Sequence, residues 1–244
     1  MPKIPARPEE IFDDFAHDYQ EAFGADLLSI ILYGSGGREE YIYKKSDINF
    51  LVVLTEVGIE MCSKAIPLVS RWHKRRVSTP LLVTPRFIAF SVDTFPVELL
   101  NLKAAYKVVY GEDVLRDLAF DKKYVRLQCE REVRGKLLHL RKQFLETGGK
   151  WRKIEELIFV SLPSFFSLFR AVRFLEDKDP AVKIRALVIS VCQDVGLDKD
   201  FFLELLAIRE GRKKLVSNQA IPLMKRYAEE ITKFSNFVGQ MATA

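Results

Sequence analysis

Two short polar segments near the start of the chain interrupt apolar runs, and together they could bind phosphate and a metal ion. The turn Gly34–Gly37, with the sequence Gly-Ser-Gly-Gly, follows the apolar run 27–33, and Asp47 precedes a second apolar run, 50–54. Glycine lets backbone N–H groups approach an anion closely, and carboxylate oxygens are the ligands that magnesium prefers. We therefore expect two strands that present a phosphate-binding turn and a metal ligand side by side.

The pattern resembles that of the nucleotidyltransferase superfamily, the polymerase-beta-like proteins that include the aminoglycoside and minimal nucleotidyltransferases. Their motif is Gly-Ser, a polar spacer, and then Asp-x-Asp or Asp-x-Glu at the head of a strand, with a third carboxylate on a later strand. Here Gly34-Ser35 and Asp47-Ile48-Asn49 match it. The resemblance implies nucleotide binding by Gly34 and Ser35, with Arg38 and Ser46 beside them.

By the same resemblance, Asp47 and Asn49 would coordinate Mg²⁺ or Mn²⁺ and act in catalysis together with a third ligand. That third ligand is expected on a strand over 97–102, where apolar residues flank Glu98 and a further strand follows at 106–110. Asp93 is the alternative, but it lies in a turn-like stretch before a proline, so we favour Glu98.

Two departures from the motif weaken the expected metal and phosphate sites. Asn49 stands where the family has its second carboxylate, and a neutral amide offers one carbonyl oxygen instead of two charged ones. Two-metal phosphoryl transfer depends on carboxylates to hold both ions. Glu39 lies close to the Gly-Ser pair, where its charge would repel a triphosphate unless neighbouring Arg38 offsets it.

Hydrophobic periodicity divides the chain into a sheet-containing domain over 1–120 and an all-helical bundle over 121–244. The first part alternates helices and strands, which predicts an α+β, nucleotidyltransferase-like mixed sheet flanked by helices. From 121 onward only helical patterns occur. The helices of the bundle are expected at 127–147, 151–175, 181–195, 201–209 and 219–238.

Composition fits a globular protein without a membrane span. The chain has 244 residues, 48% of them hydrophobic, and no apolar run of the length that crosses a bilayer. Its N-terminus lacks the apolar core of a signal peptide, so a cytoplasmic location is expected. Residues 1–120 contain 14 Lys and Arg against 17 Asp and Glu (net −3), and residues 121–244 contain 24 against 16 (net +8). The three cysteines show no zinc-binding or disulfide pattern.

The resemblance predicts a metal-dependent enzyme that transfers a nucleoside monophosphate from a nucleoside triphosphate to an acceptor hydroxyl bound between the two domains. The alternative is a nucleotide-binding or regulatory protein with the same fold and an impaired site, which Asn49 and Glu39 favour. The sequence identifies neither the acceptor nor the oligomeric state. A nucleic acid acceptor is not indicated, because no basic run is interleaved with aromatic residues. It is not excluded either.

Overall fold

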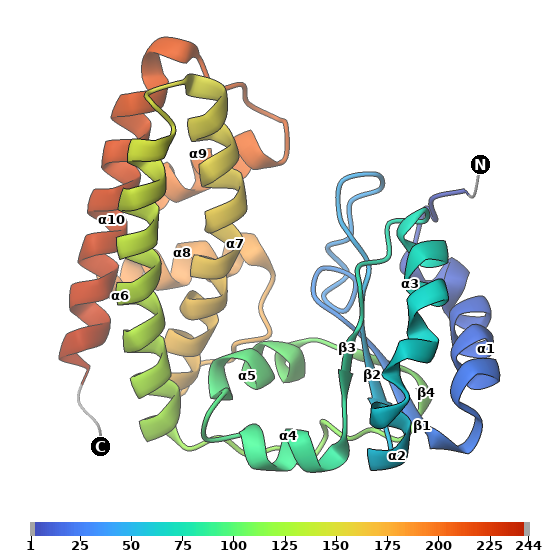
Figure 1. Ribbon diagram of the computed structural model, residues 1–244. Helices are drawn as coiled ribbons and strands as arrows, with labels where there is room; N and C mark the ends of the chain where they lie inside the picture. Colours follow the sequence, from blue (N-terminus) through green and yellow to red (C-terminus); the bar gives the residue numbers. More distant parts are fainter. Residues whose placement is uncertain (1–2, 242–244) are drawn as a thin grey trace. The chain divides into compact units, whose positions relative to one another are not determined.

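A computed structural model describes residues 3–241, which form two units that join at Phe120 and Asp121. Figure 1 labels their helices and strands. The first unit is a four-stranded sheet with helices packed on both faces, and the second unit is wholly helical. The predicted α+β class, a mixed sheet followed by a helical bundle, is confirmed.

Helices and strands alternate along the first unit. In chain order they are η1 Pro8–Ile11, α1 Phe12–Phe23, η2 Gly24–Asp26, β1 Leu27–Tyr33, β2 Asn49–Leu54, α2 Glu56–Glu60, η3 Cys62–Ala65, α3 Ile66–His73, β3 Leu81–Val83, α4 Pro85–Ser91, α5 Pro96–Ala104 and β4 Lys107–Gly111. The helical signal after β2 is divided into α2, η3 and α3. Pro67 lies in the first turn of α3, where its missing N–H costs no hydrogen bond, so a new helix starts there.

The strands lie in the order β3-β2-β1-β4, with β2 and β4 antiparallel to β1 and β3 parallel to β2. Tyr33 at the end of β1 pairs with Asn49 at the start of β2, and Leu32 pairs with Lys107 at the start of β4. The end of β1 and the starts of the other three strands therefore meet at one end of the sheet. We call it the turn end, because the Gly-Ser turn leaves β1 there.

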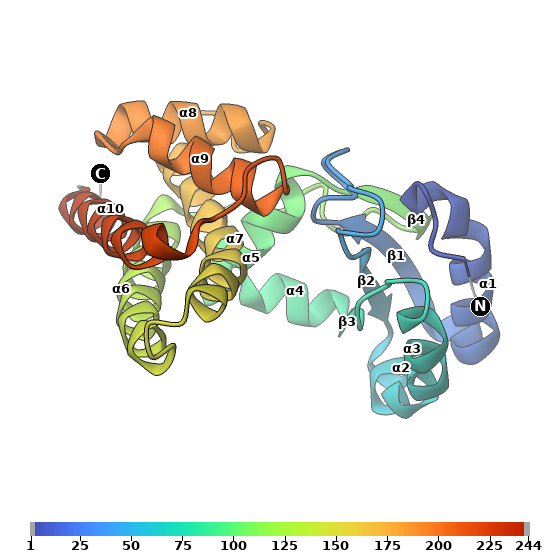
Figure 2. The same ribbon diagram turned by 90° about the horizontal axis from the view of Figure 1, so that it is seen from above.

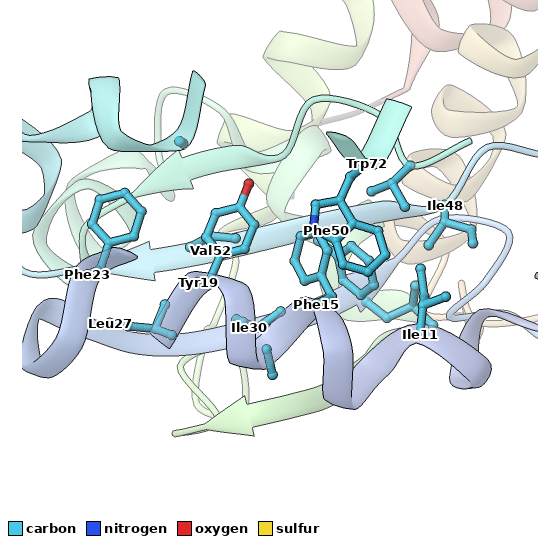
Figure 3. Packing of buried hydrophobic residues seen from close by; sticks show 14 of the residues in the cluster. Ile11, Phe15, Tyr19, Phe23, Leu27, Ile30, Ile48, Phe50, Val52 and Trp72 are labelled. Carbon is cyan, nitrogen blue, oxygen red and sulfur yellow. The ribbon is translucent and has the colours of Figure 1, made fainter. Parts of the chain in front are cut away.

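One face of the sheet packs against α1 and α3 through aromatic side chains (Figure 3). The ring of Phe15 from α1 stacks on Phe50 of β2 with centroids 4.1 Å apart, and it meets the edge of Trp72 from α3 at 5.2 Å. All three side chains are buried, as are Ile30 and Val52 on the same face of the strands. Burying aromatic rings contributes much of the stability of such a core, which holds β1 and β2 rigidly below the turn.

The opposite face packs against α4 and α5. Ile31, Leu51 and Val53 point to this side because neighbouring side chains of a strand face opposite ways. They contact Ile88 of α4 and Leu99 of α5, all of them buried. Both faces of the central strands are thus covered, which explains why β1 and β2 read as continuous apolar runs.

The predicted strand over 97–102 is wrong, because this segment forms helix α5. Pro96 occupies the first turn of the helix, and the buried residues Val97, Leu100 and Leu102 fit a helical spacing as well as a strand. Glu98 is exposed in that first turn, where a negative charge favours the helix dipole. The argument that aimed Glu98 from a strand at Asp47 therefore fails.

The second unit packs its helices around a core rich in phenylalanine. The elements are α6 Lys122–Glu146, α7 Trp151–Leu175, α8 Ile184–Val195, α9 Lys199–Arg209, η4 Ser217–Gln219 and α10 Ala220–Gln240. Figure 2 shows α6, α7 and α10 side by side, with α8 and α9 against them. Phe169 of α7 touches Phe202 of α9 and Phe234 of α10, with ring centroids 5.5 and 4.8 Å apart.

Helix α7 is long and apolar enough to cross a membrane, with a mean hydropathy of 1.5 in its most apolar window. It contacts α6, α8 and α10, however, and 56% of that window is buried within the protein. A helix that is apolar on most sides is expected wherever it is surrounded by others. Its composition is accounted for by its place in the bundle core.

Candidate functional site

The turn that follows β1 is closed by its own backbone. Gly34 has a φ of 73°, a left-handed conformation that glycine adopts without strain. The N–H of Arg38 donates to the Gly34 carbonyl at 3.1 Å, and the N–H of Glu40 donates to the Ser35 carbonyl at 2.8 Å. These hydrogen bonds fold the chain back on itself directly after the strand.

Three successive N–H groups of the turn, those of Ser35, Gly36 and Gly37, donate to no acceptor among residues 3–241. Successive unpaired N–H groups in a glycine-rich turn carry partial positive charge and form a concave anion site. Ser35 and Gly37 are partly exposed, whereas Gly36 is buried. The turn therefore has the donors that a phosphate requires.

The turn is also fixed against the segment that leads into β4. A Cβ atom added to Gly37 would lie 2.4 Å from the carbonyl oxygen of Ala105, which real Cβ atoms do not approach so closely. Gly36 packs in the same way on the side chain of Leu32, 3.0 Å from its Cδ1 atom. Gly37 is required by its close approach to backbone, whereas the neighbour of Gly36 is a flexible side chain.

Asn49 connects the turn to Asp47. A Cβ atom on Gly34 would lie 3.1 Å from Asn49 Nδ2, and the same Nδ2 donates to the backbone carbonyl of Asp47 at 3.4 Å. Asn49 is thus a donor in this arrangement, whereas a carboxylate here would only accept hydrogen bonds. The Asn49 amide takes part in the local structure of the turn end.

The carboxylate of Asp47 forms an ion pair with Arg76. Arg76 Nη2 lies 3.0 Å from Asp47 Oδ1 and 3.0 Å from the carbonyl oxygen of Lys45. The pair is open to solvent, with the Asp47 side chain 57% exposed and the Arg76 side chain 36% exposed. Exposed pairs contribute little to stability, typically below about 1 kcal/mol, but this one places a positive charge on the expected metal ligand.

Arg76 was missed in the sequence, although it is held in place by the fold. The N–H of Ile48 donates to the carbonyl of Arg76 at 2.9 Å, and Ile48 forms a parallel bridge with Val77. Arg76 itself has a φ of 62°, which is uncommon for a residue with a side chain. The only signal in the sequence was the basic run 73–76, between a helical pattern and a strand.

The remaining predicted nucleotide-binding residues have local partners. The Arg38 guanidinium pairs with Glu40 at 3.2 Å, so it does not offset Glu39, which is exposed and has a φ of 57°. The Ser46 hydroxyl accepts a hydrogen bond from the N–H of Ile42 at 3.0 Å and closes the loop before Asp47. These two side chains shape the loops that flank the turn.

Two tyrosines, Tyr41 and Tyr33, have pKa values that burial raises. Burial raises the pKa of the Tyr41 phenol, and the nearby Arg76 guanidinium partly opposes that rise. Its hydroxyl donates to the carbonyl of Pro5 at 3.1 Å. Tyr33, at the end of β1, also has its pKa raised by burial. Both phenols are therefore neutral at physiological pH, and neither adds a charge to those of Glu39, Asp47, Arg76 and the Arg38–Glu40 pair.

The structure is similar to the crystal structure of spectinomycin adenyltransferase AAD(9) from Enterococcus faecialis with ATP and spectinomycin. The match has a TM-score of 0.56 at 12% sequence identity and covers 95% of this chain and 99% of that chain. The chain has a nucleotidyltransferase-type fold. No protein-family model matches the sequence, and neither does any curated protein. At this identity the similarity establishes the fold alone.

Two-metal chemistry of the kind associated with the nucleotidyltransferase-type fold requires several carboxylates at the turn end. Strands β3 and β4, the later strands of the described sheet, contain no Asp or Glu. Among residues 3–241, no three His, Cys, Asp or Glu side chains are grouped so that they could hold a metal ion. Asp47 is already paired with a guanidinium. The residues present therefore do not fit a two-metal centre.

Neither candidate for the third carboxylate lies on a strand. Asp93 is in the loop between α4 and α5, where its Oδ1 accepts a hydrogen bond from the Thr94 hydroxyl at 3.1 Å. Glu98 lies on α5. The structure thus places Asn49 beside Gly34, joins Asn49 to Asp47 by a hydrogen bond and adds Arg76 to Asp47.

Proposed function

We propose that the first unit binds the phosphate chain of a nucleoside triphosphate at the Gly-Ser turn and does not perform two-metal nucleotidyl transfer. One observation carries the proposal: three unpaired N–H groups, of Ser35, Gly36 and Gly37, lie in a turn whose neighbouring carboxylate is neutralised by an arginine. The turn supplies the donors for an anion, and the guanidinium offsets the charge of the carboxylate.

The charges around the turn agree with phosphate binding. The segment 38–49 contains Arg38, Lys44 and Lys45 against Glu39, Glu40 and Asp47, and the segment after α3 adds Lys74 and Arg76. Clustered cations raise the local concentration of an anionic ligand. A nucleoside triphosphate is the phosphate ligand that the nucleotidyltransferase-type fold favours, since the similar protein was solved with ATP.

Nucleotidyl transfer to an acceptor hydroxyl is the second candidate function. It is favoured by the similarity to an adenyltransferase, which extends over nearly the whole chain, helical bundle included. Asp47 and the Asn49 carbonyl could bind one magnesium ion together with phosphate oxygens, because magnesium retains several waters and needs few protein ligands. This candidate requires that the ion displace the guanidinium of Arg76.

Isothermal titration calorimetry with ATP, GTP, CTP and UTP tests the proposal. The wild type should bind at least one of them, and Gly37→Ala should bind it at least tenfold more weakly, because the added methyl group must move the turn away from Ala105. Gly135→Ala is the matched control. Gly135 lies inside α6 with open space around its Cα, so that variant should bind like the wild type.

The two candidate functions differ in the release of pyrophosphate. We expect no release above background when the purified protein is incubated with the bound nucleotide, magnesium and cell extract as a source of acceptors. Release that disappears in Asp47→Ala would establish transfer as the function. Failure of all four nucleotides to bind the wild type would refute the binding proposal.

A further inference from the structure

We propose that Arg76 takes the place of the divalent cation at this site, so that the nucleoside triphosphate is bound without a metal ion; this rests on the binding function proposed above. In a metal-dependent site, Asp47 would hold an ion that bridges to the phosphates. Here the group in contact with Asp47 is the guanidinium of Arg76. A guanidinium binds phosphate oxygens through a planar set of N–H donors.

Asn49 and Asp47 link the region of the turn to Arg76. Asn49 lies beside Gly34, where an added Cβ would be 3.1 Å from its Nδ2 atom. Asn49 donates to the backbone carbonyl of Asp47, and the side chain of Asp47 accepts from Arg76. The guanidinium therefore stands beside the same carboxylate that the nucleotidyltransferase motif assigns to the metal.

The guanidinium retains donors that the protein does not use. Its Nη2 atom is bonded to Asp47 and to the Lys45 carbonyl, whereas its Nε atom is buried and has no partner among residues 3–241. Its Nη1 atom also has no hydrogen-bond partner in the described chain and is not among the buried atoms. Nη1 is therefore the part of the guanidinium that can donate to a second anion.

The backbone keeps Arg76 in this position before any ligand arrives. Its left-handed conformation, with a φ of 62°, is maintained by the bond from the N–H of Ile48 and by the parallel bridge at Val77. The backbone N–H of Ser78, two residues after Arg76, donates to the Ile48 carbonyl at 2.9 Å. Unusual backbone conformations persist where the surrounding structure fixes them, and they are common at ligand sites.

The charges fit a metal-free phosphate chain. The Arg76–Asp47 pair carries no net charge, and Lys44, Lys45 and Lys74 provide positive charge in the two loops. A second carboxylate, which would demand a metal ion as its counter-charge, is absent because position 49 is asparagine. An asparagine at position 49 and Arg76 beside Asp47 both agree with a site that binds phosphate without a metal ion.

The test is calorimetry of the tightest-binding nucleotide, and separately of inorganic tripolyphosphate, in buffer containing EDTA and in buffer containing excess magnesium. The wild type should bind both ligands in EDTA with a Kd within about threefold of its value in magnesium. In EDTA, Arg76→Gln should bind at least tenfold more weakly than the wild type. The Kd of Arg76→Lys should lie between those of the wild type and Arg76→Gln, because lysine keeps the charge but lacks the planar set of donors.

Arg75→Gln is the matched control. Arg75 is the preceding residue in the chain, but it pairs with Asp14 at 3.3 Å and lies over the ring of Trp72, away from Asp47. Its replacement should leave the Kd within twofold of the wild type. Circular dichroism and the thermal midpoint of each variant would show that it is folded.

The outcomes separate this inference from the function on which it rests. If the wild type binds no nucleotide in either buffer, the proposed function is wrong and the inference falls with it. If binding occurs only with magnesium, the function stands and the inference is refuted. Wild-type affinity of Arg76→Gln in EDTA would refute it as well, and if that variant does not fold, the comparison of buffers with the wild type still decides.

Discussion

Removing the charge of Asp47 distinguishes a metal ligand from the partner of a guanidinium, because the two roles predict opposite changes in affinity. If Asp47 holds a metal ion, Asp47→Asn should weaken nucleotide binding in the presence of magnesium. If Asp47 only pairs with Arg76, its charge repels the phosphates, and the same variant should bind metal-free nucleotide more tightly. The substitution preserves the shape of the side chain and an oxygen for Arg76.

The size of the gain follows from the distance between the charges. The 3.0 Å contact with Arg76, the width of the guanidinium and one further hydrogen bond of about 2.9 Å place a phosphate oxygen roughly 7 Å from the carboxylate. Asp47 is 57% exposed, so a dielectric constant near that of water applies. Each unit of phosphate charge then contributes about 0.6 kcal/mol of repulsion, and two units contribute about 1.2 kcal/mol.

Salt reduces this repulsion in a predictable way. At low ionic strength, about 1.2 kcal/mol corresponds to a gain in affinity of roughly eightfold, and at 0.15 M salt, where the Debye length is about 8 Å, the gain falls to roughly twofold. Calorimetry in EDTA at both salt concentrations measures the two values. Asp93→Asn, which removes an exposed charge from the loop between α4 and α5, should change neither.

A loss of metal-free affinity in Asp47→Asn would refute the reasoning. It would show that the carboxylate assists phosphate binding by holding Arg76 in place. A variant whose affinity equals that of the wild type at both salt concentrations would show that the phosphate lies farther from Asp47 than these contacts imply. Only a gain that shrinks with added salt agrees with direct repulsion.

Asn49→Asp should not start pyrophosphate release, because no third acid lies on β3 or β4. The variant should weaken metal-free nucleotide binding by about the factor by which Asp47→Asn strengthens it. Pyrophosphate release in a magnesium titration would contradict this prediction. A thiol reagent should label Cys62 alone in the native protein and all three cysteines in denaturant, since burial excludes the reagent from Cys129 and Cys192 and raises the pKa of each of those thiols to about 12. Asp198→Ala should lower the free energy of unfolding by about 1 kcal/mol at pH 7, as expected for an N-cap. Because a backbone N–H at the start of α9 and an arginine of α10 lower the pKa of Asp198, its stabilisation is present above its unfolded pKa near 3.8 and is lost as the pH falls through the lower folded pKa, so unfolding curves of the two proteins should converge there.

The first polar turn could be predicted from the sequence because local chemistry determines it. The apolar run of β1 and the glycines after it have one simple interpretation, a buried strand and a tight turn, and the structure has β1 at Leu27–Tyr33 with the turn after it. The helix α7 was equally clear, with the predicted bounds of 151–175. In such segments a single periodicity extends over several residues without competition.

Segment 97–102 shows where the local signal was ambiguous. Its short apolar run fits both a strand and a helix, and the expected role of Glu98 favoured the strand. The choice was made by Pro96 at the first turn and by the packing of Leu99 and Leu102 against the sheet. Short apolar runs of this kind are decided by what they pack against, which the sequence does not contain.

The sequence by itself determined strand β1 and the Gly-Ser turn after it, since both depend on neighbours along the chain. It also showed Asp47 at the start of the next apolar run. The tertiary structure alone decided that Asp47 faces Arg76, a residue 29 positions later. That pairing exists because β3 runs parallel to β2, so that Val77 joins Ile48 and brings the preceding arginine to the carboxylate. Parallel strands meet only through a long crossover connection, and no local pattern specifies which side chains such a connection brings together.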